Sequence, residues 1–235
     1  MKKTLISVCM AVVMGYVAAF VLCVRALNAP QPVFSMAEAG MKIVLDAGHG
    51  GIDGGVVGKQ TGTKESDINL SITFLLRDTL EEMGFEVTLT RKTEAGLYGT
   101  TAKGFKKRDM KRRREIIQET QPAMVISVHQ NFYPSRTSRG AQVFYNKESA
   151  EGKRFAMSLQ EQLNTLYVGE GVKERNASTG DYFMLECTDA PSVIVECGFL
   201  SNAADEKLLV TTAWQKKIAE GIAAGVIHYL SDFAA

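Results

Sequence analysis

The sequence predicts a single α/β domain, built on a mainly parallel, twisted sheet of about six strands with helices on both faces. Three observations support this fold class. Short apolar runs alternate along the chain with longer segments of helical periodicity. Two of these runs, residues 43–45 and 193–195, are apolar throughout, which is typical of strands covered on both faces. The length of 235 residues suffices for one domain with a proper core.

The helical segments are marked by apolar residues that recur at intervals of three and four. The first has Thr63 as a candidate N-cap and Gly84 as its stop. The last repeats apolar residues at every fourth position from Ile218 to Leu230. Each expected strand is a short run between such helices. The expected strands are 42–46, 85–90, 123–128, 141–145, 182–185 and 192–196, and the expected helices are 64–83, 106–120, 150–166 and 211–231.

The beginning of the chain differs in composition from the rest. Lys2 and Lys3 precede a charge-free, largely apolar run over residues 5–24, and Arg25 follows it. The run is long enough to cross a bilayer as a helix, and it exceeds the usual core of a cleaved signal. The paired lysines would keep the N-terminus inside.

We therefore expect an exported, membrane-tethered or secreted domain. Residues 1–25 are interpreted as a membrane anchor or signal segment that contacts the membrane through residues 4–24. Residues 26–40 follow as a linker, and residues 41–235 as the folded domain. Cleavage after the small residues that end at Ala37 is the alternative, and both fates send the domain out of the cytoplasm.

Charge in the expected domain is balanced. Of 27 basic and 26 acidic residues, three basic and one acidic lie in the first 40, which leaves 24 and 25. We expect no nucleic-acid binding from such a balance. One stretch, residues 103–114, holds eight basic residues and one acidic residue. We interpret it as the solvated face of a helix, because no aromatic side chains alternate with the charges. Contact with an anionic wall polymer or a partner stays open.

Two cysteines, Cys187 and Cys197, fall in the expected domain on neighbouring expected strands. We interpret them as small core residues, with a disulfide outside the cell as the alternative. The chain has no CxxC motif, which excludes a thiolate zinc site of that kind.

A glycine-rich segment, VLDAGHGG, leaves the first expected strand. A dinucleotide loop would need glycine where Asp53 stands. A P-loop that ends at Gly58 and Lys59 would also need glycine there, and Ser or Thr where Gln60 stands. Phosphate binding by these two motifs is therefore excluded. What remains is a loop that lets the backbone pass close to a ligand, with His49 directed from it.

Two of the three histidines come directly after strands. His49 follows the first expected strand, and His129 follows another apolar strand, so both are expected at one edge of a parallel sheet. Two imidazoles suit a metal, and a catalytic zinc needs one more protein ligand beside an open position for water. Glu65, in the first turn of the next helix, is the candidate, with compensation of the helix dipole as the alternative. The third histidine, His228, is expected to be solvated on the last helix.

A carboxylate ends a third strand. Glu196 follows the apolar run 193–195, and a carboxylate there is costly to bury unless it is paired. Glu196 is therefore a candidate general base, with a solvated strand end as the alternative.

In family order, these motifs resemble those of the zinc-dependent N-acetylmuramoyl-L-alanine amidases. The matching segments are IVLDAGHGG, Glu65 with Asn69 four positions later, ISVHQN, and PSVIVECGFLSN. They span nearly all of residues 41–231. The chain looks most like the spore-cortex, germination-specific type of endospore-forming bacteria, which pairs an N-terminal membrane segment with a bare catalytic domain.

The resemblance implies a set of residue roles. His49, Glu65 and His129 would bind one zinc ion, and Glu196 would be the catalytic glutamate. Asn131 and Arg113 would contact substrate; for Arg113, which matches a family arginine sixteen residues before the second histidine, bracing of the fold is the alternative.

The resemblance also implies the substrate, partner and place of action. The bond cleaved would be the amide between N-acetylmuramic acid and the L-alanine of the stem peptide, on peptidoglycan glycan strands. The role would be spore cortex maturation through muramic-δ-lactam, with a lipoprotein partner in some relatives. The expected place is the space between forespore and mother-cell membranes, or the outer face of the cytoplasmic membrane. A non-catalytic wall- or partner-binding module and a zinc peptidase acting on another amide are the alternatives.

Overall fold

The structure, a computed structural model, describes residues 40–232. The expected membrane segment and linker, except for the last linker residue, lie outside the described residues. Within residues 40–232, no helix combines the length and apolar character needed to cross a membrane.

Strands and helices alternate along the described chain, as expected. In order, the elements are β1 (Lys42–Ala47), α2 (Glu65–Glu82), β2 (Glu86–Leu89), α3 (Phe105–Thr120), β3 (Met124–Asn131), β4 (Gln142–Tyr145), α4 (Ala150–Val168), β5 (Ser178–Thr179), the 3-10 helix η1 (Phe183–Glu186), β6 (Ser192–Phe199), α5 (Ala203–Leu209) and α6 (Thr212–Ser231).

The six strands form one sheet in the order β2-β1-β3-β6-β4-β5. All neighbouring pairs are parallel except β4 and β6, which run antiparallel. The prediction of a mainly parallel sheet is confirmed. Because β1, β3 and β6 are adjacent and parallel, their carboxyl ends meet at one edge of the sheet, where an open α/β fold binds its ligands.

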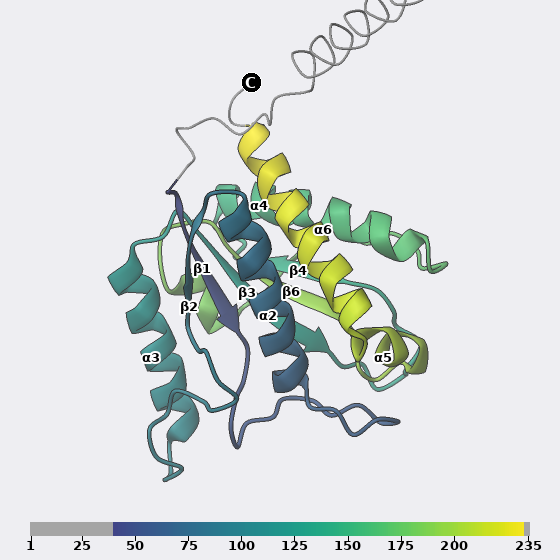
Figure 1. Ribbon diagram of the computed structural model, residues 1–235, viewed down its shortest axis with the longest axis horizontal. Coiled ribbons are helices and arrows are strands. Elements are labelled where there is room, and N and C mark those ends of the chain that lie inside the picture. Colours follow the sequence, from purple (N-terminus) through teal and green to yellow (C-terminus); the bar gives the residue numbers. More distant parts are fainter. Residues whose placement is uncertain (1–39, 233–235) are drawn as a thin grey trace, which may run out of the picture. The chain divides into compact units, whose positions relative to one another are not determined.

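Helices cover the sheet on both faces. α6 packs against both α2 and α4, and these three helices lie side by side, whereas α3 stands apart from them (Figure 1). The second face carries a separate apolar cluster in which Val44, Val125 and Ile194 of the sheet meet Ile117 of α3 and Met184 of η1. Successive side chains on β1, β3 and β6 thus enter the cores on opposite faces of the sheet, which explains why the runs 43–45 and 193–195 are apolar throughout.

The expected strand 182–185 is wrong, because this segment forms η1. Met184 and Leu185 are 4% and 5% exposed, so the apolar run packs on the sheet without pairing to it. A short apolar run cannot be assigned to strand or buried helical turn from periodicity alone. The sixth strand is instead β5, whose two residues carry no pattern, and α5 was not expected.

The two cysteines of the described chain, Cys187 and Cys197, are free and buried. Their interpretation as core residues is confirmed. Cys187 follows η1 as its C-cap and so is not on a strand.

Candidate metal centre and active site

His49 lies on the loop that leaves β1, with a left-handed backbone conformation at φ 62°. The residue before it must be glycine because of a close approach. A Cβ atom on Gly48 would lie 2.2 Å from Cε1 of His129, so any other residue would push that ring away. The glycine-rich segment therefore lets the ends of β1 and β3 bring two imidazoles together.

The other expected site residues come from three elements at the same edge. His129 and Glu196 are direct partners on the neighbouring strands β3 and β6. Glu65 is the first residue of α2 and is 2% exposed. The N-terminus of α2 has no side-chain cap; instead, the amide of Glu65 donates to the carbonyl of Val56 at 2.8 Å. The loop after His49 thus caps the helix that presents Glu65.

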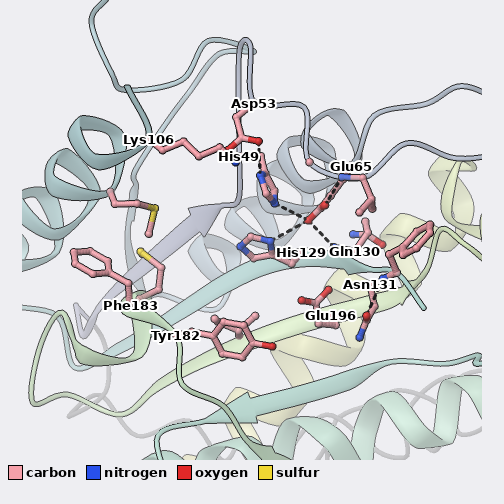
Figure 2. A pocket seen from close by; sticks show the side chains of 16 residues that line it. His49, Asp53, Glu65, Lys106, His129, Gln130, Asn131, Tyr182, Phe183 and Glu196 are labelled. Atoms are coloured by element: carbon pink, nitrogen blue, oxygen red, sulfur yellow. Dashed lines mark hydrogen bonds and ion pairs between the residues drawn. The ribbon is translucent and has the colours of Figure 1, made fainter. Parts of the chain in front are cut away.

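His49, Glu65 and His129 converge on one point (Figure 2). Oε1 of Glu65 lies 3.3 Å from Nε2 of His49 and 2.9 Å from Nδ1 of His129. The two imidazole rings meet edge to face, with centroids 5.0 Å apart. One ligand atom from each residue lies within 4.8 Å of the others, and no other such trio of His, Cys, Asp or Glu occurs among residues 40–232.

Hydrogen bonds fix the carboxylate of Glu65. Oε1 accepts from the amide of Gln130 at 3.1 Å and from Nδ2 of Asn69 at 3.3 Å, and Oε2 accepts from the amide of Val56 at 2.9 Å. Burial opposes ionisation, yet the hydrogen bonds and charges of His129 and His49 hold the pKa of Glu65 well below its usual range. The carboxylate is therefore ionised at neutral pH and available as a ligand.

The donor set fits a metal of the zinc type. Two imidazoles and one carboxylate are ligands that zinc takes in catalytic sites, where three protein ligands leave a further position open. His49 also has a carboxylate behind it, since its Nδ1 lies 3.2 Å from Oδ1 of Asp53. Carboxylates in this position orient metal-binding histidines.

Glu196 lines the same pocket (Figure 2). Its Oε2 is buried and has no hydrogen-bond partner among the described residues. Burial, with a smaller contribution from the negative charge of Glu65, raises the pKa of Glu196 to about 7, although His129 and His49 oppose the shift. A carboxyl group with this pKa can take up and release a proton near neutrality.

The pocket around these groups has a volume of about 520 Å³. Its lining combines the His49, Glu65 and His129 group, Glu196 and Asn131 with apolar side chains. The apolar lining comes from Val56, Met110, Phe132, Tyr182, Phe183, Met184 and Ile194.

Arg113 is 1% exposed, and its guanidinium contacts the chain itself. It donates to the carbonyl oxygens of Ala47 and His49 and to the carboxylates of Asp46 and Asp109. His228, on α6, lies outside the metal group, and Nδ1 is 3.6 Å from a carboxylate oxygen of Glu161.

Sequence reasoning missed Asp53, Tyr182 and Phe183. Asp53 stands four residues after His49, and this spacing in a tight loop was the available signal. Tyr182 and Phe183 were hidden by the wrong strand assignment.

Comparison with known proteins gives a consistent assignment. Residues 43–228 match the family described as N-acetylmuramoyl-L-alanine amidase. The germination-specific N-acetylmuramoyl-L-alanine amidase of Bacillus subtilis is 34% identical over 202 residues, which cover 85% of this chain and 84% of that protein. The structure of the CwlD amidase from Clostridioides difficile, in complex with the GerS lipoprotein, is similar with a TM-score of 0.77 and 38% identity, over 82% of this chain and 99% of that one.

A second solved structure agrees. The catalytic domain of CwlV, an N-acetylmuramoyl-L-alanine amidase from Bacillus (Paenibacillus) polymyxa, has a TM-score of 0.68 and 28% identity, over 81% of this chain and 98% of that one. The family match spans the sheet, the four polar site residues and most of α6. The resemblance seen in the motifs is confirmed, and this chain belongs to the N-acetylmuramoyl-L-alanine amidase family.

Proposed function

We propose that this chain uses zinc to hydrolyse the amide between N-acetylmuramic acid and the L-alanine of the stem peptide in peptidoglycan. The observation that carries the proposal is the convergence of His49, Glu65 and His129 within 4.8 Å, with the carboxyl group of Glu196 lining the same pocket. Family membership supports the bond that is cleaved.

His49, Glu65 and His129 would hold the zinc ion, since they supply three ligand atoms at one point. Bound there, zinc would supply a Lewis acid that polarises the scissile carbonyl and lowers the pKa of water from ~15.7 towards ~7. Asn69 and Gln130 keep Glu65 in place by hydrogen bonds to its Oε1.

Glu196 moves the proton. Its carboxylate accepts a proton from the attacking water and then returns it to the nitrogen of the leaving L-alanine. In the metal-free site the pKa of Glu196 is about 7, so neither form of the carboxyl group is strongly favoured near neutrality. Protonation of the amine prevents the C–N bond from forming again.

The pocket lining supplies substrate contacts. Asn131 would donate to or accept from the substrate at the end of β3, and Phe132 and Tyr182 would contact its apolar parts. The burial of Arg113 and its bonds to the chain support the bracing role for this residue.

The test joins metal analysis to product analysis. The purified full chain is expected to hold about one zinc ion and to release intact stem peptides from sacculi and isolated cortex. Mass spectrometry identifies the bond: free muramoyl ends indicate the proposed amidase, whereas cuts within the peptide would indicate a zinc peptidase. Zinc-replete protein that is inert on both substrates, with and without partners, would indicate a binding module.

The biological role proposed is formation of muramic-δ-lactam in the spore cortex. The similarity to a germination-specific amidase supports it. Such an enzyme works outside the cytoplasm, in the space between forespore and mother-cell membranes or at the outer face of the cytoplasmic membrane. A lipoprotein partner is proposed because CwlD was crystallised with the GerS lipoprotein. Spores that lack this chain are expected to have cortex without muramic-δ-lactam, measured on digested cortex.

A further inference from the structure

The basic stretch 103–114 divides into two sides once it is seen in α3. Lys107 and Lys111 are exposed, and Arg112 pairs with Glu115 and Glu119 on the outer surface. This side fits the expected solvated face. The other side carries Lys106, Asp109 and Arg113, whose spacing of three and four residues places them on one face of the helix.

Arg113 holds the backbone of the loop that carries His49. Its Nη2 donates to the carbonyl of His49 at 2.6 Å, and its Nη1 donates to the carbonyl of Ala47 at 2.8 Å. Ala47 is the last residue of β1 and still pairs with Val128 of β3, whereas His49 lies beyond the strand, on the loop. The left-handed conformation of His49 is thus fixed from outside the loop.

Two carboxylates compensate the buried charge of Arg113. Nη1 lies 2.6 Å from Oδ1 of Asp46, and Nε lies 2.6 Å from Oδ2 of Asp109. Arg113 is 1% exposed, and burying its charged guanidinium costs free energy unless the group is paired and hydrogen-bonded. The planar, forked group can reach all four acceptors at once, which a lysine ammonium on its flexible stem cannot do.

The same face of α3 also reaches the ring of His49, through Asp53 (Figure 2). Nζ of Lys106 lies 3.3 Å from Oδ2 of Asp53, and Oδ1 of Asp53 lies 3.2 Å from Nδ1 of His49. With Nδ1 directed at Asp53, Nε2 of the ring is the atom directed at Glu65, at 3.3 Å.

We propose that the inner face of α3 is a positioning device for the zinc ligand His49. Arg113, held by Asp109, fixes the backbone of His49, and Lys106 fixes Asp53, which orients the ring. None of these residues is a zinc ligand; each acts through His49. The inference rests on the proposed zinc site. It gives a role to the basic stretch that neither the family match nor the pocket assigns.

The experiment measures the dissociation constant of zinc in the purified full chain by competition with a chelator. Loss of an oriented carboxylate behind a metal-binding histidine costs about 10- to 100-fold in affinity. We expect this range for Asp53→Ala and Arg113→Lys, with a partial recovery for Asp53→Asn, which keeps an acceptor oxygen. Lys106→Ala is expected to weaken binding less, and to have no further effect in the Asp53→Ala background, because Lys106 acts through Asp53.

Two variants serve as controls. Lys107→Ala removes the same charge from the neighbouring position of α3, which is exposed as Lys106 is, but it leaves the Lys106–Asp53 ion pair intact and should leave zinc affinity unchanged. Val226→Ala, in the core on α6, lowers stability without touching the site and should also leave it unchanged. Cobalt substitution adds a direct readout, since the visible spectrum of bound Co²⁺ should change in Asp53→Ala and stay as in the unchanged chain in both controls.

Three results would overturn the inference. The first is an unchanged chain that binds zinc while Asp53→Ala and Arg113→Lys bind it equally well. The second is a loss in Val226→Ala as large as theirs, because general instability would then be the cause. The third is an additive effect of Lys106→Ala and Asp53→Ala on zinc affinity, because Lys106 would then not act through Asp53. If Arg113→Lys does not fold, these two variants test the inference without it. An unchanged chain that binds no zinc is a different outcome, since it refutes the proposed function and the inference together.

Discussion

Glu196 combines a buried position with an unpaired oxygen, and few side chains outside active sites do so. Burial disfavours the charged form of this carboxyl group and so raises its pKa to about 7. Across the strand pair from it, His129 binds Glu65 instead of Glu196, so the imidazole does not satisfy the free oxygen. The pKa values of the two carboxyl groups in the site therefore differ: Glu65 is ionised at neutral pH, whereas Glu196 can exchange a proton there.

Replacing Glu196 by Gln should remove turnover and leave zinc in place. General acid–base groups contribute about 10²- to 10⁴-fold to rate, so we expect a decrease of at least about 100-fold in stem-peptide release. Zinc content, measured by mass spectrometry of the metal, should stay at that of the unchanged chain, because Glu196 is not a proposed ligand. Full activity in this variant would show that another group transfers the proton.

The raised pKa of Glu196 also predicts a pH-dependent stability in the metal-free chain. A carboxyl group whose pKa rises from 4.5 to about 7 on folding favours the folded state below the lower value, and this advantage is lost as pH rises through the higher one. Glu196→Gln should therefore be more stable than the unchanged chain at pH 8, by up to about 3 kcal/mol. Near pH 4.5 the gain should vanish. Denaturant unfolding with chelator present measures both, and an equal difference at the two pH values would contradict the prediction.

At the level of elements, the site depends on one loop, between β1 and α2, that passes close to two ligand side chains. A Cβ on Gly48 would meet the ring of His129, and one on Gly55 would lie 2.4 Å from Oε2 of Glu65. The same loop caps α2 through the carbonyls of Gly54 and Val56. The loop after β1 therefore presents one ligand, makes room for a second and begins the helix of the third.

Gly48→Ala should disrupt the metal group with little change elsewhere. The new Cβ would lie 2.2 Å from Cε1 of His129, so the ring must move. A displacement of about 1 Å in such a site lowers rate about 100-fold, and we expect at least that loss of activity together with weaker zinc binding. Gly221→Ala is the matched control, because its Cβ would make only an ordinary contact of 3.6 Å with Leu163 on the far helical layer. Activity in Gly48→Ala equal to that in the control would contradict the close approach.

At the scale of the whole molecule, zinc would join distant parts of the chain. Its proposed ligands are His49 on the loop after β1, Glu65 on α2 and His129 on β3. An ion that binds the folded state alone stabilises it by mass action.

Removal of zinc should therefore lower global stability. At a free zinc concentration 100 times the dissociation constant, the free energy of unfolding should exceed that of the chelated chain by about 2.7 kcal/mol. Thermal or denaturant unfolding with and without chelator gives the difference. His129→Ala, which removes one proposed ligand, should show almost none, and a difference that persists in this variant would place the stabilising ion elsewhere.

The architecture and the four central residues were predictable because each depends on local pattern. Apolar runs followed by His49, His129 and Glu196 identify strand ends, and parallel strands bring such ends together. The contacts of Arg113 were not predictable, because its partner Asp46 lies 67 residues away and no periodicity links them. The same holds for η1, since Met184 and Leu185 are apolar in a strand and in a buried helical turn alike.

His129 and Glu196 occupy facing positions on hydrogen-bonded strands, whereas Tyr182 and the 3-10 turn after it stand outside the sheet ladder. The residues proposed to catalyse the reaction and the aromatic residue proposed to contact substrate therefore lie on separate elements. Random mutagenesis confined to residues 180–184 offers a route to altered preference among muropeptides, with hydrolytic competence preserved by the strands beneath.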